Sequence, residues 1–359
     1  MRGEVVYLYA FDVANEIATE KVKDILANKP FPFEIRTHHT FPKDVPLYKP
    51  LAIEPPALPA SLGGRAVRLL IRVYSVGVVS IAMRVPFENE KLADLVPLHK
   101  PVLENGVTLD QVARDLCADV CKSLADVLIE RSLPSEPEAY TVFCLTEAGS
   151  ERDVNGWLAE NRRAVAELLT ETAAGGLSEM QTAEVLRIQR SYGNADLVVI
   201  DWDAALVVDL SGYVDDVLYV LELANLQLEE YRVMDQRLDR YLDRAYEDLK
   251  RGRFGMLGTY SKTLSTLRLF RVDVTKLNDE VTHISKFFGD WYLARVFLGA
   301  SERFYLSQWR QSVADRLGQL DQLYSVVNSD INNRRMVWLE VLVVIFFAID
   351  LAMLAFWRR

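Results

Sequence analysis

Residues 65–85, RAVRLLIRVYSVGVVSIAMRV, decide the fold class of the first half of the chain. Aliphatic and β-branched residues fill this stretch, and the segment Ser75-Val76-Gly77 divides it into two runs of strand length. Two such runs joined by a short segment that contains glycine are typical of neighbouring β-strands. Comparable runs predict three more strands, at Val5–Phe11, Phe33–Thr40 and Tyr140–Leu145. The sequence therefore predicts a β-sheet built from separated segments of the chain.

Helical spacing of apolar residues alternates with these strands. The predicted helices are Thr108–Ile129, Asp153–Thr172 and Ser178–Tyr192. A further hairpin is predicted where Leu197–Asp201 and Ala204–Leu210 flank a short turn. We therefore expect residues 1–212 to form a mixed α/β soluble domain, with a sub-boundary near residues 147–152.

After Gly212 the apolar positions step by three and four residues, which is the pattern of a coiled coil. The seam positions are Leu221, Ala224, Leu228, Tyr231, Asp235, Leu238, Leu242, Ala245 and Leu249. Asp235 is the polar member, which either fixes the register or lies at the edge of the seam. A second helix is expected at Ser261–Phe288, and a third begins near Trp291 or Ser301 and continues toward the C-terminus. We interpret residues 213–335 as a long antiparallel stalk. Its seams can close within one chain or between chains, and we expect a homo-oligomer.

The composition of the chain narrows its function classes. The chain has 359 residues, 50% of them hydrophobic, and a formal net charge of −10 with a pI of about 5.1. This balance argues against broad phosphate binding, which needs clustered Lys and Arg, so we find no strong nucleic-acid signal. Three cysteines are too few for a disulfide framework and favour a reducing compartment. Glu4, Asp12 and Glu16 argue against a signal peptide.

Residues Met336–Trp357, MVWLEVLVVIFFAIDLAMLAFW, form the most apolar run of the chain. As a helix at ~1.5 Å per residue the run is about 33 Å long, which matches a bilayer core of about 30 Å. Basic residues flank it on both sides, namely Arg334, Arg335, Arg358 and Arg359. The run therefore predicts one C-terminal transmembrane helix, with the lipid bilayer as a partner. The fold class expected is α+β, with the mixed domain, the stalk and this helix following one another.

The absence of an export signal places the soluble part in the cytoplasm on this interpretation, as a tail-anchored, single-pass membrane protein. Two carboxylates, Glu340 and Asp350, interrupt the predicted span. An ionised side chain inside a bilayer costs a few kcal/mol and needs a partner, a proton or water. Asp350 therefore marks helix assembly, an ion path or a proton site, or else lies near the far interface and is drawn toward Arg358.

An acidic set around the predicted hairpin is the best candidate for chemistry. Asp201 and Asp203 form a DxD pattern after an apolar strand, and Asp209 follows the next strand. Carboxylate oxygens suit Mg²⁺, Mn²⁺ or Ca²⁺, so a divalent cation is the one cofactor that the sequence suggests. Aspartate is also common in hairpin turns, where it needs no metal.

The C-terminal stretch also resembles a known family. The family's degenerate pattern of a coiled helix that runs into one terminal span is matched by Leu317, Leu320, Leu323, Asn332, Arg334, Leu339 and Glu340. In this the chain resembles the required-for-meiotic-nuclear-division family of single-pass membrane proteins. The segment Tyr74–Met83 is similar to that family's glycine-centred strand. The resemblance implies a membrane-tethered protein without known catalysis.

Three functions remain open at this point. The preferred one is a non-enzymatic, membrane-tethered scaffold or adaptor that oligomerises through its helices and displays the α/β domain to a protein partner. The first alternative is an oligomeric ion channel or ion sensor that uses Asp350, Glu340 and the acidic cluster. The second alternative is a divalent-metal-dependent enzyme built around Asp201 and Asp203.

Overall fold

A computed structural model describes most of the chain. The described residues are 1–25, 31–32, 50–59, 61–88, 91–132, 136–147, 153–209, 214–250, 272 and 291–357. The strand expected at Phe33–Thr40 and the helix expected at Ser261–Phe288 lie almost wholly outside them. The chain divides into two compact units: Met1–Val233 with Asn278–Trp309, and Met234–Leu277 with Arg310–Arg359. This division falls inside the helix Val214–Lys250.

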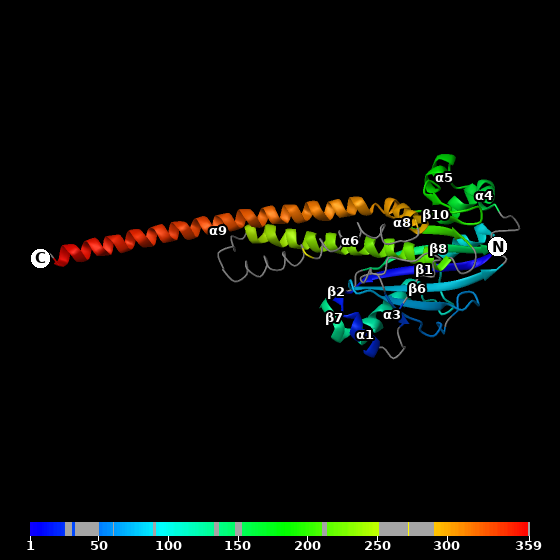
Figure 1. Ribbon diagram of the computed structural model, residues 1–359, viewed down its shortest axis with the longest axis horizontal. Coiled ribbons are helices and arrows are strands. Elements are labelled where there is room, and N and C mark those ends of the chain that lie inside the picture. The colour runs from blue at the N-terminus through cyan, green and yellow to red at the C-terminus, as the bar shows by residue number, and fades with distance from the viewer. Residues whose placement is uncertain are drawn as a thin grey trace. The chain divides into compact units, whose positions relative to one another are not determined.

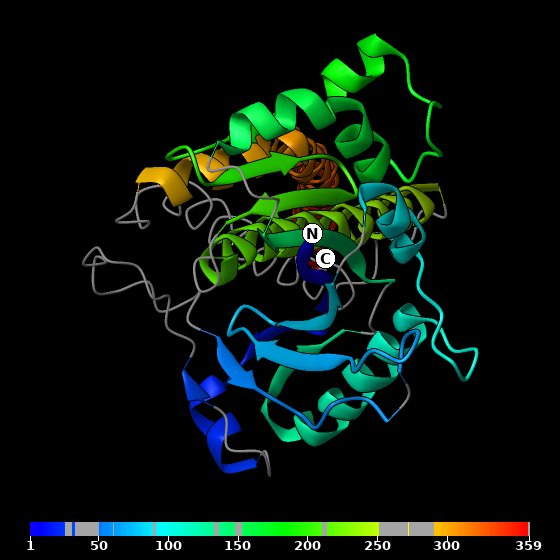
Figure 2. The ribbon, with the colours of Figure 1, turned by 90° about the vertical axis from the view of Figure 1, so that its right-hand side faces the viewer.

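The first unit contains a nine-stranded sheet with the order β3-β4-β5-β6-β1-β8-β11-β10-β9 (Figures 1 and 2). All of its neighbours are antiparallel except β8 and β11, which are parallel. In spatial order the strands are Phe31–Pro32, Leu51–Ile53, Arg68–Val73, Val78–Glu88, Arg2–Asp12, Glu138–Glu147, Ala204–Val208, Leu197–Ile200 and Gln189–Arg190. A separate pair joins β2 (Ala14–Ile17) and β7 (Leu128–Arg131). The predicted sheet is confirmed, together with the hairpins β5–β6 and β10–β11.

Gly77 makes the β5–β6 hairpin possible. Its φ is +91°, a conformation that costs other residues free energy. A Cβ at this position would lie 1.8 Å from the carbonyl oxygen of Ala14. The carbonyl oxygen of Gly77 in turn accepts hydrogen bonds from the backbone N–H groups of Val13 and Ala14. The turn therefore holds the end of β1 as well as its own two strands.

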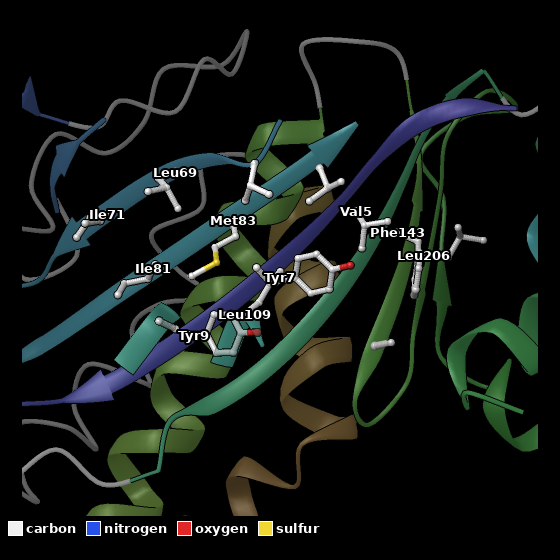
Figure 3. Close-up of a cluster of buried hydrophobic side chains, with 14 of the residues drawn as sticks. Val5, Tyr7, Tyr9, Leu69, Ile71, Ile81, Met83, Leu109, Phe143 and Leu206 are labelled. Carbon is white, nitrogen blue, oxygen red and sulfur yellow. The ribbon is translucent and has the colours of Figure 1, made fainter. Parts of the chain in front are cut away.

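One face of the sheet carries the main hydrophobic core, to which alternate residues of β1, β5, β6, β8 and β11 contribute (Figure 3). The helices beside this core are α1 (Thr19–Ile25), α2 (Leu92–Leu95), η2 (Val96–His99), α3 (Leu109–Ser123), α4 (Val154–Leu169) and α5 (Glu179–Val185). The hydroxyl of Thr108 caps α3 by accepting from the N–H of Gln111. Tyr9 donates a 2.7 Å hydrogen bond to Asp110, which fastens the start of α3 to β1.

The opposite face of the sheet is covered by the part of α6 (Val214–Lys250) that belongs to the first unit, up to Val233, and by α8 (Trp291–Arg303). From Asp216 to Tyr231 every residue of α6 is buried, including six polar or charged ones. Ion pairs join this helix to the strands: Arg84 with Asp215, Arg232 with Glu138, and Arg72 with Glu222. The described part of the first unit is therefore a three-layer α/β/α arrangement.

The second unit contains the later part of α6 and most of α9 (Leu306–Trp357, 52 residues). Asp235 on α6 accepts a 3.3 Å hydrogen bond from Ser312 and lies 3.0 Å from Nε of Arg316. The apolar seam positions here are buried, namely Leu238, Leu242, Val313, Leu317 and Leu320. In this stretch the seam therefore closes within one chain.

The third predicted helix is interrupted. Phe304 and Tyr305 separate α8 from α9, and the φ of Tyr305 is +53°. The sequence has neither proline nor glycine at this point, so the break had no local signal.

The predicted membrane anchor is contradicted. None of the helices in the described part of the chain is both long and apolar enough to cross a membrane. Glu340 and Asp350 limit the longest uncharged stretch of the terminal run to Val341–Ile349. At ~1.5 Å per residue these nine residues span only about 13 Å, less than half of a bilayer core of about 30 Å. The single-pass, tail-anchored topology and the cytoplasmic placement were inferred from this span, and they are contradicted with it.

Candidate functional site

The predicted DxD motif lies at the end of β10, and the structure gives its first carboxylate a partner. Asp201 is 6% exposed and forms an ion pair with Arg303, the last residue of α8, which is 8% exposed. A second nitrogen of Arg303 lies 2.9 Å from Oε1 of Glu184 on α5. Burial works against the charge of Arg303, but the two carboxylates outweigh it and raise its pKa. One arginine therefore forms ion pairs with two acids from different elements.

Aromatic side chains surround this cluster on both sides of the helix break. Tyr140 on β8 donates a 3.0 Å hydrogen bond to the carbonyl oxygen of Asp201, and its ring meets that of Phe304 edge-on at 5.1 Å. Burial raises the pKa of Tyr140, so its hydroxyl stays protonated and can donate. Trp202 and Tyr305 pair their rings at 5.6 Å. The β10–β11 turn thus holds the segment where α8 ends and α9 begins.

Asp203, the second carboxylate of the motif, faces a different set of groups. Burial and the charge of Asp201 raise its pKa, while His99 and Lys100 act in the opposite direction. His99 is partly buried, and its Nε2 lies 2.5 Å from the carbonyl oxygen of Leu168, so that nitrogen carries a proton and donates. Burial lowers the pKa of His99, which keeps the ring neutral at neutral pH.

Asp209 does not join the other two aspartates. It follows the far end of β11, whereas Asp201 and Asp203 precede that strand. The six steps from Asp203 to Asp209 span roughly 20 Å at ~3.3 Å per strand residue. Within the described residues, no group of three or more His, Cys, Asp or Glu side chains is placed to hold a metal ion. The Asp201 carboxylate is occupied by a guanidinium instead.

A second buried polar cluster connects α6 with β5. Arg72 is 5% exposed and pairs with Glu222, which is 1% exposed. Tyr74 donates a 3.1 Å hydrogen bond to the other oxygen of Glu222. Burial, followed by the charge of Glu222, raises the pKa of Tyr74 well above its ordinary value, so this hydroxyl also stays protonated. The cluster fixes the helix against the sheet and is closed to solvent.

The remaining predicted site residues lie on or beyond α9. Glu340 and Asp350 are exposed. Arg334 and Arg335 are within the helix, and Arg358 and Arg359 lie outside the described residues.

Sequence reasoning missed both buried clusters. Arg303 and Asp201 are 102 positions apart, and Arg72 and Glu222 are 150 apart. No local pattern connects such partners. The one available signal was the row of polar residues at heptad spacing within the apolar part of α6, namely Asp215, Glu222 and Glu229.

Comparisons with known proteins identify a family. A model described as "Uncharacterized protein MJ0711, N-terminal domain" matches residues 2–215, more than half of the chain. The uncharacterized protein MJ0711 of Methanocaldococcus jannaschii is 22% identical over 260 residues, which cover 72% of each chain. No solved structure matches. The resemblance to the required-for-meiotic-nuclear-division family is contradicted. The family model and the relative that match this chain both belong to a different family, and neither shows a link to a membrane. The chain belongs to the MJ0711 N-terminal domain family.

Proposed function

We propose that the protein is a non-catalytic scaffold that assembles with copies of itself through the C-terminal part of α9 and displays its α/β unit. The observation that carries this proposal is the exposure of that helix. From Asp321 onward, no α9 residue whose exposure is described is buried, and residues 336–350 are exposed without interruption. Trp338 is 71% exposed and Phe347 is 69% exposed. Contiguous apolar surface of this kind is typical of an interaction site.

The heptad pattern supports copies of this chain as the occupants. Leu317 and Leu320, which are buried in the second unit, occupy positions a and d of a heptad. Continued in the same register, positions a and e hold Trp338, Leu342, Ile345 and Ile349. The seam that packs within the chain near Leu320 therefore continues beyond it with exposed side chains.

The two carboxylates fit the same register. Counted from Trp338 at position a, Glu340 falls at position c and Asp350 at position f. Positions c and f lie on the side of a helix opposite to an a/d/e seam. Both carboxylates can therefore stay ionised in water while the seam is buried. A charge on the seam itself would oppose assembly.

The alternatives have less support. Ion conduction by Glu340 and Asp350 depended on the membrane span, which is contradicted. A metal-dependent reaction at the DxD motif would have to displace Arg303 from Asp201, and burial of that ion pair makes its removal costly.

The proposal is tested by two matched double variants of the whole chain. Leu342→Gln with Ile345→Gln removes apolar surface at seam positions, and Val343→Gln with Phe347→Gln removes it at positions f and c. Burial of each seam side chain contributes about 1.5–3 kcal/mol, so the first pair should weaken assembly by more than tenfold. The second pair should leave it within a few-fold. Analytical ultracentrifugation over a concentration series measures the association constant of each variant. Equal weakening by the two pairs would contradict assembly through the seam.

A further inference from the structure

A small pocket lies in the first unit, on the side of the sheet that carries the main core. Its volume is about 190 Å³. It is lined by Ala93, Val96 and Pro97 from α2 and η2, and by Ala164, Glu167 and Thr172 from α4 and the segment after it. All but two of these side chains are apolar, and Glu167 is the charged one. The residues that line the pocket belong to neither of the two buried ion clusters.

The side chain of Glu167 is buried, with 9% of its surface exposed. Within the described residues, the printed contacts of its carboxylate all fall on one oxygen, Oε1. Oε1 accepts a 2.6 Å hydrogen bond from the N–H of Gly175, and Nε of Arg163 lies 3.6 Å from the same oxygen. Gly175 has a φ of +82°, which turns its N–H toward the carboxylate. Among the described residues, no contact occupies Oε2. One oxygen of a buried carboxylate is thus left for a ligand.

Among the described residues, the one cation near this carboxylate is Arg163, and it compensates the negative charge only in part. The side chain of Arg163 is 51% exposed, and at 3.6 Å its Nε is beyond ordinary hydrogen-bond length. The same guanidinium donates to the carbonyl oxygen of Leu177. A buried carboxylate is stabilised by a close cation that also donates hydrogen bonds. A compact ammonium group meets this need, and a short aliphatic chain behind it matches the apolar lining.

We propose that this pocket binds a short primary alkylammonium through Oε2 of Glu167. The ligand chemistry is shared by a free small amine and by the side chain of a lysine on a peptide. The alkyl chain lies against Val96, Pro97 and Ala164, and the ammonium group donates to the carboxylate. This binding activity is additional to self-assembly and does not depend on it.

Calorimetric titration of the full chain tests the proposal with three probes: n-butylamine, Nα-acetyl-lysine amide and the uncharged control n-butanol. Saturable binding of butylamine with no binding of butanol is expected. Binding of the lysine derivative as well assigns the site to lysine side chains, whereas binding of butylamine alone assigns it to free amines. Absence of saturable binding by both amines at millimolar concentration overturns the proposal, as does equal binding of butanol.

Matched variants separate charge recognition from folding. Glu167→Gln keeps an oxygen that accepts from Gly175, so the fold should persist while amine affinity falls at least tenfold. Arg163→Met removes the competing guanidinium and should raise amine affinity several-fold. Ala164→Leu fills the pocket without touching the carboxylate and should abolish binding. Unchanged affinity in folded Glu167→Gln protein, verified by its thermal transition, would overturn the assignment.

Discussion

Arg303 at the end of α8 and Asp201 at the end of β10 form a buried ion pair that joins a helix terminus to a sheet terminus across 102 sequence positions. The first carboxylate of the DxD motif, which the sequence alone suggested for metal binding, is therefore held by a guanidinium. The pair also places the break between α8 and α9, because Phe304 and Tyr305 follow Arg303 directly and pack on aromatic rings of the sheet side.

Removal of Arg303 should be strongly destabilising. Arg303→Met leaves the buried carboxylate of Asp201 without its cation, which typically costs about 3–5 kcal/mol in the free energy of unfolding. Arg187 offers a matched control, since its ion pairs with Glu302 and Glu184 are formed by side chains that are all at least 42% exposed. Arg187→Met should cost at most about 1 kcal/mol. Urea denaturation measures both, and similar losses in the two variants would contradict the role assigned to the buried pair.

Gly77 should tolerate no side chain. In Gly77→Ala the new Cβ meets the carbonyl oxygen of Ala14 at 1.8 Å in a left-handed conformation, so we expect a loss of more than about 2 kcal/mol. Gly64 also has a positive φ, of +75°, but no atom lies within 4 Å of its Cβ position. Gly64→Ala should therefore cost only the backbone strain of about 1–2 kcal/mol. Equal midpoints of thermal unfolding in the two variants would refute the close approach.

His99 should contribute to the pH dependence of the free energy of unfolding. The pKa of His99 is lowered in the folded protein, chiefly by burial. Its contribution to stability is therefore present above the unfolded pKa of about 6.5 and is lost as the pH falls through the folded value. His99→Gln can still donate to the Leu168 carbonyl but cannot titrate. The variant should show a smaller loss of stability between pH 7 and pH 5 than the parent, as measured by denaturant midpoints.

Asp203 should contribute to the pH dependence of stability with the sign opposite to that of His99. Its pKa is raised by burial and by the charge of Asp201, so its contribution is present below the unfolded pKa and is lost as the pH rises through the folded value. At neutral pH the ionised group disfavours folding. Asp203→Asn should therefore raise the unfolding midpoint at pH 7 and leave it nearly unchanged at pH 3. A lower midpoint at pH 7 would show that the carboxylate forms a favourable interaction instead.

The strands could be read from the sequence because each carries its own signal. Alternation and glycine placement located β1, β5, β6, β8 and the β10–β11 hairpin. Helix ends were less accurate where the tertiary structure decides them. The helix predicted to reach Ile129 ends at Ser123, because residues 128–131 pair with β2. The helix predicted to reach Tyr192 ends at Val185, since Gln189 and Arg190 pair with β10.

The candidate site was less predictable than the fold. The DxD motif was noticed, but its chemistry depends on Arg303, which the chain brings to it from a distant helix. In the same way, burial of Glu167 could not be foreseen, because it arises from the packing of α4 against α2 and from the loop at Gly175. The terminal helix was located correctly, but the membrane assigned to it was not supported.

The most direct test of the central claim is the mass of the full-length chain in solution, measured beside a chain that ends at Asn333. The account predicts an oligomer for the full-length chain and a monomer for the shortened one, because the exposed seam lies beyond residue 333. Two monomers would contradict assembly altogether. Two oligomers of the same size would place the contact elsewhere in the molecule and contradict the role of the C-terminal seam.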